Sequence, residues 1–319
     1  MADTTAAAPR TDDDVRPGAS PSPGRPRRQG PPGEPRRVAY LYLAPALLVF
    51  GLFLLLPLLH AVYLSFFEWD GLGLGTWVGL GNYADVLTDP ELRAPFWHAL
   101  VLVAFFCVVP VSLGLLLASL MTRSAVRGAG FFRSVIFLPQ VVALTVVAVA
   151  WRDIFAPQGP LNDVLRAVGL DAFARGWLGD ASWVLVAVGV VGVWVGTGLC
   201  MVLFLAGLSN VGRELYEAAR IDGAGFWREL VSISLPSLRG EIAVAVTLTM
   251  VAALRTFDLV YVMTGGGPGR ASTVPSYEVY QRAMERGQVG TGVTVALLLT
   301  AVILLATVLV NRLAEERDR

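Results

Sequence analysis

Residues 208–240 read LSNVGRELYEAARIDGAGFWRELVSISLPSLRG, a charged stretch between two strongly apolar ones. Residues 214–222 are good helix formers, and Gly223 and Gly225 supply a turn that can end the helix. The residues between this turn and Pro236 predict a second short helix, because a proline limits how a helix continues. The stretch therefore predicts a helix, a turn and a helix at a membrane surface.

The first of these helices carries side chains suited to binding a partner. Ala218 and Ala219 are small, so another backbone can come close, while Glu217 and Arg220 offer charged contacts. The apolar anchors are Leu215, Tyr216, Ile221, Phe226 and Trp227. The alternative interpretation is an amphipathic surface loop that binds nothing.

Apolar segments lie on both sides of this loop and fill most of the chain. The sequence is 55% hydrophobic and only 16% charged, and its mean hydropathy is +0.62. Crossing the ~30 Å hydrocarbon layer takes roughly 20 apolar residues in a helix. Segments of that length lie at about 40–66, 97–121, 134–152, 183–207, 241–263 and 290–311. The sequence predicts an all-α membrane protein with six transmembrane helices spanning residues 38–312.

The positions of the arginines predict the orientation. All 25 basic residues are arginine, and alternate loops beginning with the N-terminal tail carry 17 of them, against 7 in the opposite loops. Since basic residues stay on the cytoplasmic side, both termini and the 208–240 loop are expected there. Residues 1–37 are rich in Pro and Arg and predict a disordered cytoplasmic tail, and residues 313–319 predict a short second tail.

The absence of lysine excludes several enzyme classes. A P-loop needs a lysine, so ATP hydrolysis requires another chain. No intramembrane protease motif is present, and His60 and His98 stand apart from cysteine or paired carboxylates, so we expect neither an enzyme nor a metal site. A net charge of zero gives no indication of nucleic-acid binding.

Polar residues inside the expected spans are candidates for a solute path. Arg255 and Asp258 lie in the fifth span, where a lone charge costs roughly 2.5–3.5 kcal/mol, and their i, i+3 spacing lets them pair on one helix face. Either they border the path or they form a structural pair. Trp194 can stack on a sugar ring or can pack between helices. Gln140 and Thr197 are further candidates.

The 208–240 loop resembles the "EAA" signature of permease subunits from binding-protein-dependent ABC importers. Its positions are Glu217, Ala218, Ala219, Gly223, Ile233, Leu235 and Pro236. The runs Ile221–Ala224, Thr256–Pro268 and Gly79–Tyr83 are similar to the carbohydrate-uptake branch, in particular to its maltose- and glycerol-phosphate-type "F/A" subunits. The resemblance covers about residues 38–312.

The resemblance implies a type I ABC importer permease fold in a bacterial cytoplasmic membrane. The implied ATPase-coupling residues are Glu217, Ala218, Ala219, Arg220, Asp222, Gly223, Ile233, Leu235 and Pro236. The implied partners are a second permease, an ATP-binding subunit dimer that holds ATP and Mg²⁺, and an extracytoplasmic solute-binding protein. This chain would form half of the path for a sugar or sugar derivative. The alternatives are an importer permease for a non-sugar solute and a self-sufficient secondary transporter.

Overall fold

The computed structural model describes residues 36–123 and 128–316. This part of the chain is mainly helical, with loops between the helices and one antiparallel hairpin of β1 (Phe67–Glu68) and β2 (Thr76–Trp77). The all-α prediction is therefore confirmed. The chain divides into two units at Leu55 and Leu56, and each is described by itself.

The described part of the first unit is helical throughout. It consists of α1 (Arg36–Phe50) and a π-helical turn, η1 (Gly51–Leu55). Arg36 and Arg37, which the sequence places in the N-terminal tail, therefore belong to α1. Residues 1–35 of the predicted tail lie outside the described residues. The predicted C-terminal tail is helical as far as Glu316, and its last residues, 317–319, are also outside.

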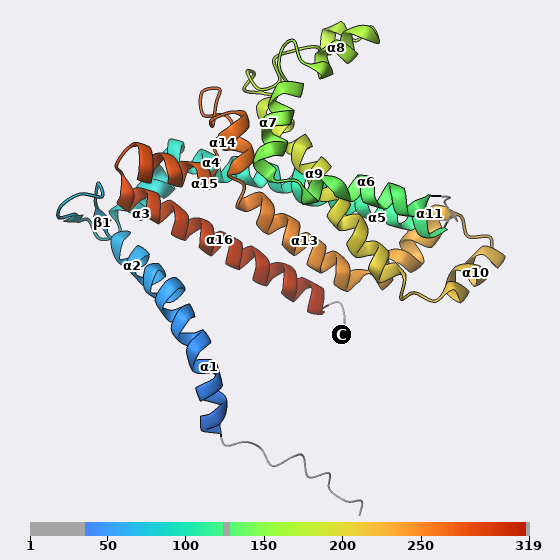
Figure 1. Cartoon of the computed structure of the whole chain (residues 1–319), viewed down its shortest axis with the longest axis horizontal. Helices are drawn as coiled ribbons and strands as arrows, with labels where there is room; N and C mark the ends of the chain where they lie inside the picture. Colours follow the sequence, from blue (N-terminus) through green and yellow to red (C-terminus); the bar gives the residue numbers. More distant parts are fainter. Residues whose placement is uncertain (1–35, 124–127, 317–319) are drawn as a thin grey trace, which may run out of the picture. The chain divides into compact units, whose positions relative to one another are not determined.

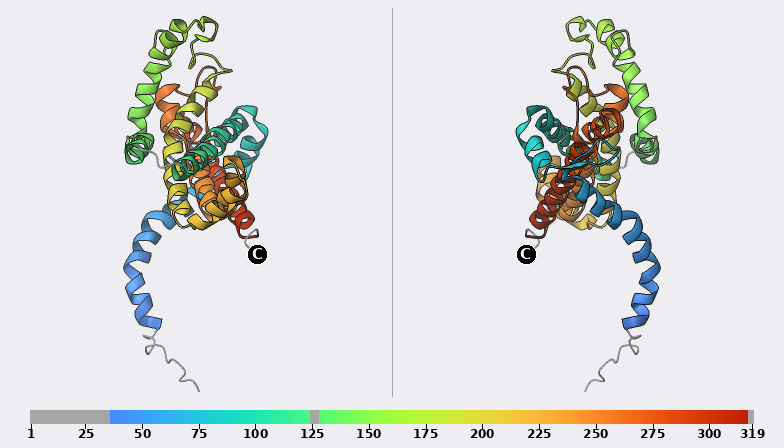
Figure 2. Two further views of the ribbon diagram at one scale, coloured as in Figure 1. Left: turned by 90° about the vertical axis from the view of Figure 1, so that its right-hand side faces the viewer. Right: turned by 90° about the vertical axis from the view of Figure 1, so that its left-hand side faces the viewer.

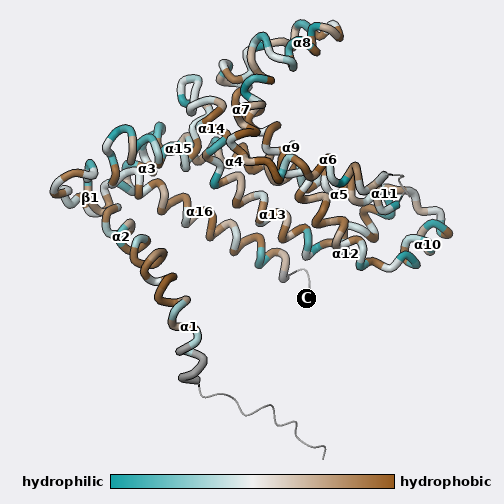
Figure 3. The backbone as a smooth tube through the Cα atoms, viewed as in Figure 1, coloured by the Kyte–Doolittle hydropathy of each residue, from teal (hydrophilic) through white to brown (hydrophobic). Residues whose placement is uncertain are grey.

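Four helices in the described residues are long and apolar enough to cross a membrane. Figure 1 shows the course of these helices, and Figure 3 shows the hydropathy of their residues. They run over Tyr42–Leu64, Pro90–Arg123, Val184–Leu208 and Val289–Ala314. They match the first, second, fourth and sixth predicted spans. The second starts earlier than predicted because Asp89 caps it: its carboxylate accepts the Glu91 N–H at 2.8 Å, and Pro90 fits the first helical turn.

The predicted third span, 134–152, is not one straight helix. Helix α6 (Ala129–Val141) and helix α7 (Leu144–Ile154) meet at an angle of 99°. Val142 and Ala143 between them are extended, and this breaks the helical hydrogen-bond ladder. The expectation of a continuous helix is wrong there, because hydropathy cannot detect a bend made by apolar residues.

The predicted fifth span, 241–263, is also interrupted. Helix α13 (Arg239–Leu254) ends before α14 (Asp258–Met263) begins. Helix α13 is also one member of a second bent pair, because the helical segment Phe226–Ser237 meets it at an angle of 79°. Counting each bent pair as one span gives up to six crossings.

The centre of the second unit is built on close contact between helices. Helix α5 (Val109–Arg123) and helix α9 (Val184–Leu208) lie side by side, and α6 packs against α9 (Figures 1 and 2). Gly114 makes this contact possible, because a Cβ there would lie 2.6 Å from Cβ of Cys200. Buried Phe204, Met201 and Leu238 fill the neighbouring core.

A second group of helices packs beside the first. Helix α13 contacts α16 (Val289–Glu316), and α16 also contacts α2 (Leu56–Leu64), α3 (Gly81–Thr88) and α15 (Pro275–Tyr280) (Figure 1). The side chain of buried Asn82 holds this region together. It donates to the carbonyls of Ser65 and Phe67, both at 2.9 Å, and accepts a hydrogen bond from Thr291 at 3.2 Å.

The segment between α7 and α9 is organised by one buried asparagine. It contains α8 (Pro160–Ala167) and the 3-10 turn η3 (Asp171–Phe173). Asn162 donates to the Arg175 carbonyl at 2.8 Å and accepts from the Trp177 indole at 3.0 Å. Hydrophilic residues gather around α8 and also around α10 (Arg213–Ile221), whereas α9 is mainly hydrophobic (Figure 3). The polar loop thus acquires a defined structure without a large apolar core of its own.

Candidate functional site

The 208–240 loop folds as the sequence predicts, into helix, turn and helix. Helix α10 (Arg213–Ile221) is followed by α11 (Phe226–Glu229), the π-helical turn η4 (Leu230–Ser234) and α12 (Leu235–Ser237). Glu214 near the start of α10 and Arg220 near its end complement the helix dipole. Because Pro236 lacks an N–H, the π-helical geometry falls in the turn before it.

Gly223 ends α10 in a Schellman motif. Its φ is +78°, its N–H donates to the Arg220 carbonyl at 3.0 Å, and the Ala224 N–H donates to the Ala219 carbonyl at 2.8 Å. This left-handed conformation favours glycine, so the residue fixes where the helix stops. The motif explains why a glycine follows the helix at this spacing.

The predicted coupling residues lie on two consecutive elements. Glu217, Ala218, Ala219 and Arg220 are on α10, while Asp222 and Gly223 form its end. Ile233 is half-buried in η4, and Leu235 and Pro236 are exposed in α12.

Within residues 36–123 and 128–316, nothing covers the outer face of α10. Glu217 and Ala218 are exposed, and Ile221 is 87% exposed. Leu215 and Trp227 are also exposed large apolar side chains. A short helix that presents apolar side chains to its surroundings is suited to docking in a partner's groove.

Behind α10 lies a buried carboxylate that sequence reasoning missed. Glu229 Oε1 is 3.0 Å from Nε of Arg220 and 3.7 Å from Nη2 of Arg123, the last residue of α5. The guanidinium of Arg123 also lies 5.7 Å from the ring centre of Phe226. The hydrogen bond to Glu229 raises the pKa of Arg220. A single glutamate among exposed charges gives no signal of burial in the sequence.

A cavity of about 600 Å³ adjoins this carboxylate. Its lining includes Arg123, Arg133, Arg213, Arg220, Glu217 and the hydroxyl-bearing Ser119. The Ser119 hydroxyl is buried and has no hydrogen-bond partner among the residues that the structure describes. Four arginines and two glutamates, Glu217 and Glu229, thus line the cavity.

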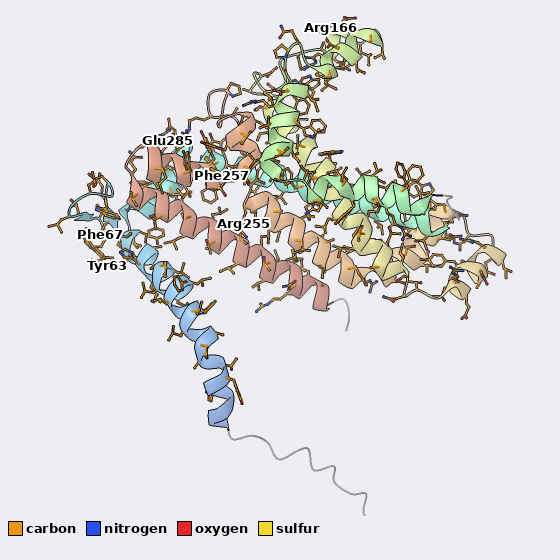
Figure 4. The ribbon with its side chains drawn as sticks, viewed as in Figure 1. Tyr63, Phe67, Arg166, Arg255, Phe257 and Glu285 are labelled. Carbon is orange, nitrogen blue, oxygen red and sulfur yellow. The ribbon has the colours of Figure 1, made fainter. Side chains whose placement is uncertain are left out.

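Arg255 and Asp258 do not form the helical pair that their spacing predicts. Helix α13 ends at Leu254, where Arg255 caps it (Figure 4). Asp258 is the first residue of α14. Phe257 has φ −129° and ψ −57°, so the chain leaves the helical path between the two charges. Among the described residues no ion pair involves either side chain, and both are exposed. The prediction of a shared helix face is wrong.

The indole ring of Trp194 is partly exposed, whereas Gly198, one helical turn further along α9, allows close packing against α6. The indole is 44% exposed and lies 5.6 Å from the ring of Trp151, edge to face. A side chain at Gly198 would overlap the Ile136 carbonyl of α6, so that glycine is needed for helix contact. Thr197 is buried and donates to the Val193 carbonyl at 2.6 Å, which occupies its hydroxyl. Gln140 is exposed.

A second aromatic group was not found by sequence reasoning. It consists of Phe257, Tyr261, Tyr277 and Tyr280. Phe257 and Tyr261 stack at 5.2 Å, and Tyr261 meets Tyr280 edge to face at 5.4 Å. Tyr261 is exposed, whereas burial raises the pKa of Tyr277. Three of these aromatic residues belong to α14 or α15, so only the fold of the intervening loop reveals the group.

That loop is fixed by a second buried carboxylate. Glu278 accepts from Arg282 Nε at 2.6 Å and from Arg270 Nη2 at 2.5 Å. Arg270 also donates to the Glu91 carbonyl at 3.2 Å, and His98 Nδ1 lies 2.8 Å from the Thr273 carbonyl. The loop is thereby joined to the start of α4 (Pro90–Val103).

None of these groups has the composition of a metal site. Within residues 36–123 and 128–316, no three His, Cys, Asp or Glu side chains come together as metal ligands. The chemistry available is ion pairing, hydrogen bonding and ring stacking, which suits binding and movement.

Comparison with known proteins agrees with this picture. Residues 111–318 match the family model described as "Binding-protein-dependent transport system inner membrane component". The chain is 38% identical over 256 residues to the probable ABC transporter permease protein YurN of Bacillus subtilis, covering 79% of this chain and 87% of that one. It is 33% identical to the lactose transport system permease protein LacF of Rhizobium radiobacter, covering 76% and 80%.

A third relative and one solved structure extend the comparison. The trehalose/maltose transport system permease protein MalF of Thermococcus litoralis is 32% identical, with 85% of this chain and 92% of that one covered. A chain of a bacterial ABC transporter that imports the acidic polysaccharide alginate has a TM-score of 0.76 at 19% identity, covering 89% of this chain and 96% of that one. This last likeness concerns the fold alone.

Proposed function

We infer the function of this chain from its family: it belongs to the inner membrane components of binding-protein-dependent transport systems, and we propose that it forms half of the translocation path of an ATP-driven sugar importer. Members of this family are permeases, non-enzymatic components of a transporter embedded in the membrane. The proposed solute is a sugar or sugar derivative delivered by an extracytoplasmic binding protein.

The observation that carries the proposal is helix α10, a short exposed helix with a defined end. It combines uncovered apolar side chains such as Ile221 with a glycine stop at Gly223, in a loop that matches the family signature residue by residue. We propose that α10 docks in a cleft of a cytoplasmic ATPase, with Glu217 and Arg220 as polar contacts. Ile233, Leu235 and Pro236 would carry α10 into the following span.

The sugar assignment is supported by two kinds of observation. The relatives named above include permeases for lactose and for trehalose and maltose. In this chain, the rings of Trp194 and Tyr261 are 44% and 45% exposed, each in contact with another aromatic ring. Flat aromatic faces and nearby hydrogen-bonding groups are the usual means of holding a sugar.

The proposed assembly has several further chains. A second permease completes the path, because this chain would supply half of it, and a dimer of ATP-binding subunits holds ATP and Mg²⁺. The complex would lie in a bacterial cytoplasmic membrane with both termini of this chain inside and six crossings. ATP binding would close the ATPase dimer, and α10 would pass that motion to the spans, which open to the outside. The transporter would thus alternate between an inward-open and an outward-open state, and the ATPase would shift the balance between them.

The first test is purification of the tagged full chain in mild detergent, with mass spectrometry of the proteins bound to it. We expect a second permease and an ATPase. These chains, reconstituted in liposomes with the matching binding protein, should take up a sugar only when ATP is enclosed with the ATPase. Uptake by this chain alone, driven by an ion gradient, would instead establish a secondary transporter. ATP-driven uptake of a peptide or metal, with no sugar bound, would refute the sugar assignment.

A further inference from the structure

Glu229 is the point where the exposed loop helix and a membrane helix meet. Its Oε1 is 3.0 Å from Arg220 of α10 and 3.7 Å from Arg123, the last residue of α5. We propose that Glu229 is a positioning residue that transmits the movement of docked α10 to α5. The proposal rests on the proposed function, since it explains how the same loop drives the spans.

Burial makes this carboxylate a fixed centre. Its side chain is 4% exposed, against 43% for Arg220 and 34% for Arg123. A buried carboxylate without its cationic partners has a large unfavourable desolvation free energy. When Glu229 moves, the two arginines must therefore move with it. Charge-assisted hydrogen bonds are also short and directional. Displacement of either arginine is therefore resisted by the other through Glu229.

Helix α10 has few other links to the rest of the protein. It contains no buried residue. In the part of the chain that the structure describes, its side chains make two polar contacts with other elements, Arg220 to Glu229 and Tyr216 to Ser234 at 3.0 Å. Glu229 lies in α11 and Ser234 lies in η4. Of the two contacts, the one at Glu229 continues to α5, through the ion pair between Glu229 and Arg123. Besides the backbone that joins α10 to α9, this centre is the route by which a force applied to α10 by a docked partner reaches α5.

The other end of the link is firmly attached. Arg123 ends α5, and its guanidinium also lies over the Phe226 ring of α11, at 5.7 Å from the ring centre. Helix α5 packs against α9 along a close contact at Gly114. Movement of Arg123 therefore displaces the central helices of the fold, and with them the helix that carries Trp194.

The experiment uses the complete importer, with its second permease, ATPase and binding protein, in liposomes. The variant is Glu229→Gln, which keeps the shape and removes the charge, and the matched control is Arg228→Gln, an exposed neighbour with no ion pair in the described residues. We measure sugar uptake and ATP hydrolysis in the same preparation. We expect Glu229→Gln to lower uptake per ATP by at least about fivefold, the lower end of usual coupling free energies, and the control to resemble wild type.

A double-mutant cycle tests whether Glu229 and Arg123 act through one contact, and the yield of the complex separates this role from a merely structural one. Arg123→Gln removes the same contact from a partly exposed position, so it remains usable if Glu229→Gln assembles poorly. We expect each single variant to lower uptake per ATP, and the double variant to be no worse than Glu229→Gln alone.

Two results would overturn the proposal. Uptake per ATP equal to wild type in both single variants would show that movement does not pass through Glu229. Additive losses, in step with lower yield of the complex, would show a stabilising role only. Absence of ATP-driven uptake in the wild-type complex is a different result, because it would refute the proposed function itself.

Discussion

Glu278 Oε1 accepts a 2.6 Å hydrogen bond from Nε of Arg282, one turn further along the chain, and the carboxylate is completely buried. Arg270 binds the second oxygen of the same carboxylate from the glycine-rich end of the loop. One acidic side chain thus joins both ends of the segment between α14 and α16. The loop is a folded element that presents Tyr277 and Tyr280 together with Tyr261.

Replacing Glu278 with glutamine should destabilise this loop. Breaking a buried ion pair leaves an uncompensated charge and costs about 3–5 kcal/mol, and here two arginines lose their partner. We expect a lower melting temperature of the purified complex in detergent. The control is Glu285→Gln in the same segment, an exposed glutamate without an ion pair in the described residues. Equal melting temperatures for the two variants would contradict the role of Glu278.

Gly114→Val should prevent normal packing of α5 on α9. The added Cβ would meet Cβ of Cys200 at 2.6 Å and the Met201 backbone nitrogen at 2.8 Å. Overpacking typically costs about 1–3 kcal/mol, and backbone atoms yield less readily than side chains. We expect little folded protein in a fluorescence-detected gel filtration. Gly240→Val on α13, where no atom lies within 4 Å of the new Cβ, should elute as wild type does.

Asn162→Ala should loosen residues 155–183 without disturbing the membrane helices. The substitution removes donors to the Arg175 and Ala156 carbonyls and the acceptor for the Trp177 indole. Each buried group left unsatisfied costs about 1–3 kcal/mol. Hydrogen exchange should become faster in this segment alone. Asn210→Ala, at an exposed position, serves as the comparison, and unchanged exchange in Asn162→Ala would disprove the prediction.

Gly223→Val should separate ATP hydrolysis from uptake. A β-branched residue is strained at φ +78°, by about 1–3 kcal/mol, so the end of α10 must change. We expect the reconstituted importer to hydrolyse ATP with little uptake, and Glu217→Arg to act similarly by altering the docking face. Gly225→Val tests the interpretation, because Gly225 has φ −78° and open space around it. Normal transport in Gly223→Val and Glu217→Arg together would remove the case for docking through α10.

Arg255→Ala should change uptake more than abundance. Arg255 is exposed and has no ion pair in the described residues, so its removal leaves no buried charge behind. Because Asp258 is not its partner, the effects of Arg255→Ala and Asp258→Ala should add. Uptake rates normalised to membrane abundance give the measurement. An unchanged rate at equal abundance would assign Arg255 a structural role.

Sequence patterns predicted those elements that depend on neighbouring residues. The span at 183–207 is found at Val184–Leu208, and the helix at 214–222 is found at Arg213–Ile221. In both cases good helix formers are followed within a few residues by a signal that ends the helix. That signal is a charged loop after the span and Gly223 after the shorter helix. Local chemistry was sufficient there because tertiary contacts do not oppose it.

Bends and buried charges escaped prediction for a common reason. Val142 and Ala143 are as apolar as the helices on either side, so nothing in their hydropathy signals the 99° turn. Arg123, one partner of Glu229, belongs to a distant segment. The partners of Glu278, Arg270 and Arg282, are near it in the sequence, but a carboxylate looks the same there whether it is buried or exposed. The i, i+3 spacing of Arg255 and Asp258 gave a wrong prediction because residues at this spacing share a helix face only where the helix continues.

The narrow contact between α9 and its neighbours also bears on the permeability barrier of the membrane. At Gly192 a Cβ would overlap the Phe106 ring, and at Gly114 it would overlap Cys200, so these surfaces meet without a gap. A file of water molecules has no room at these two contacts. The glycines thus exclude water from between α9 and its neighbours at these two points of the helix bundle.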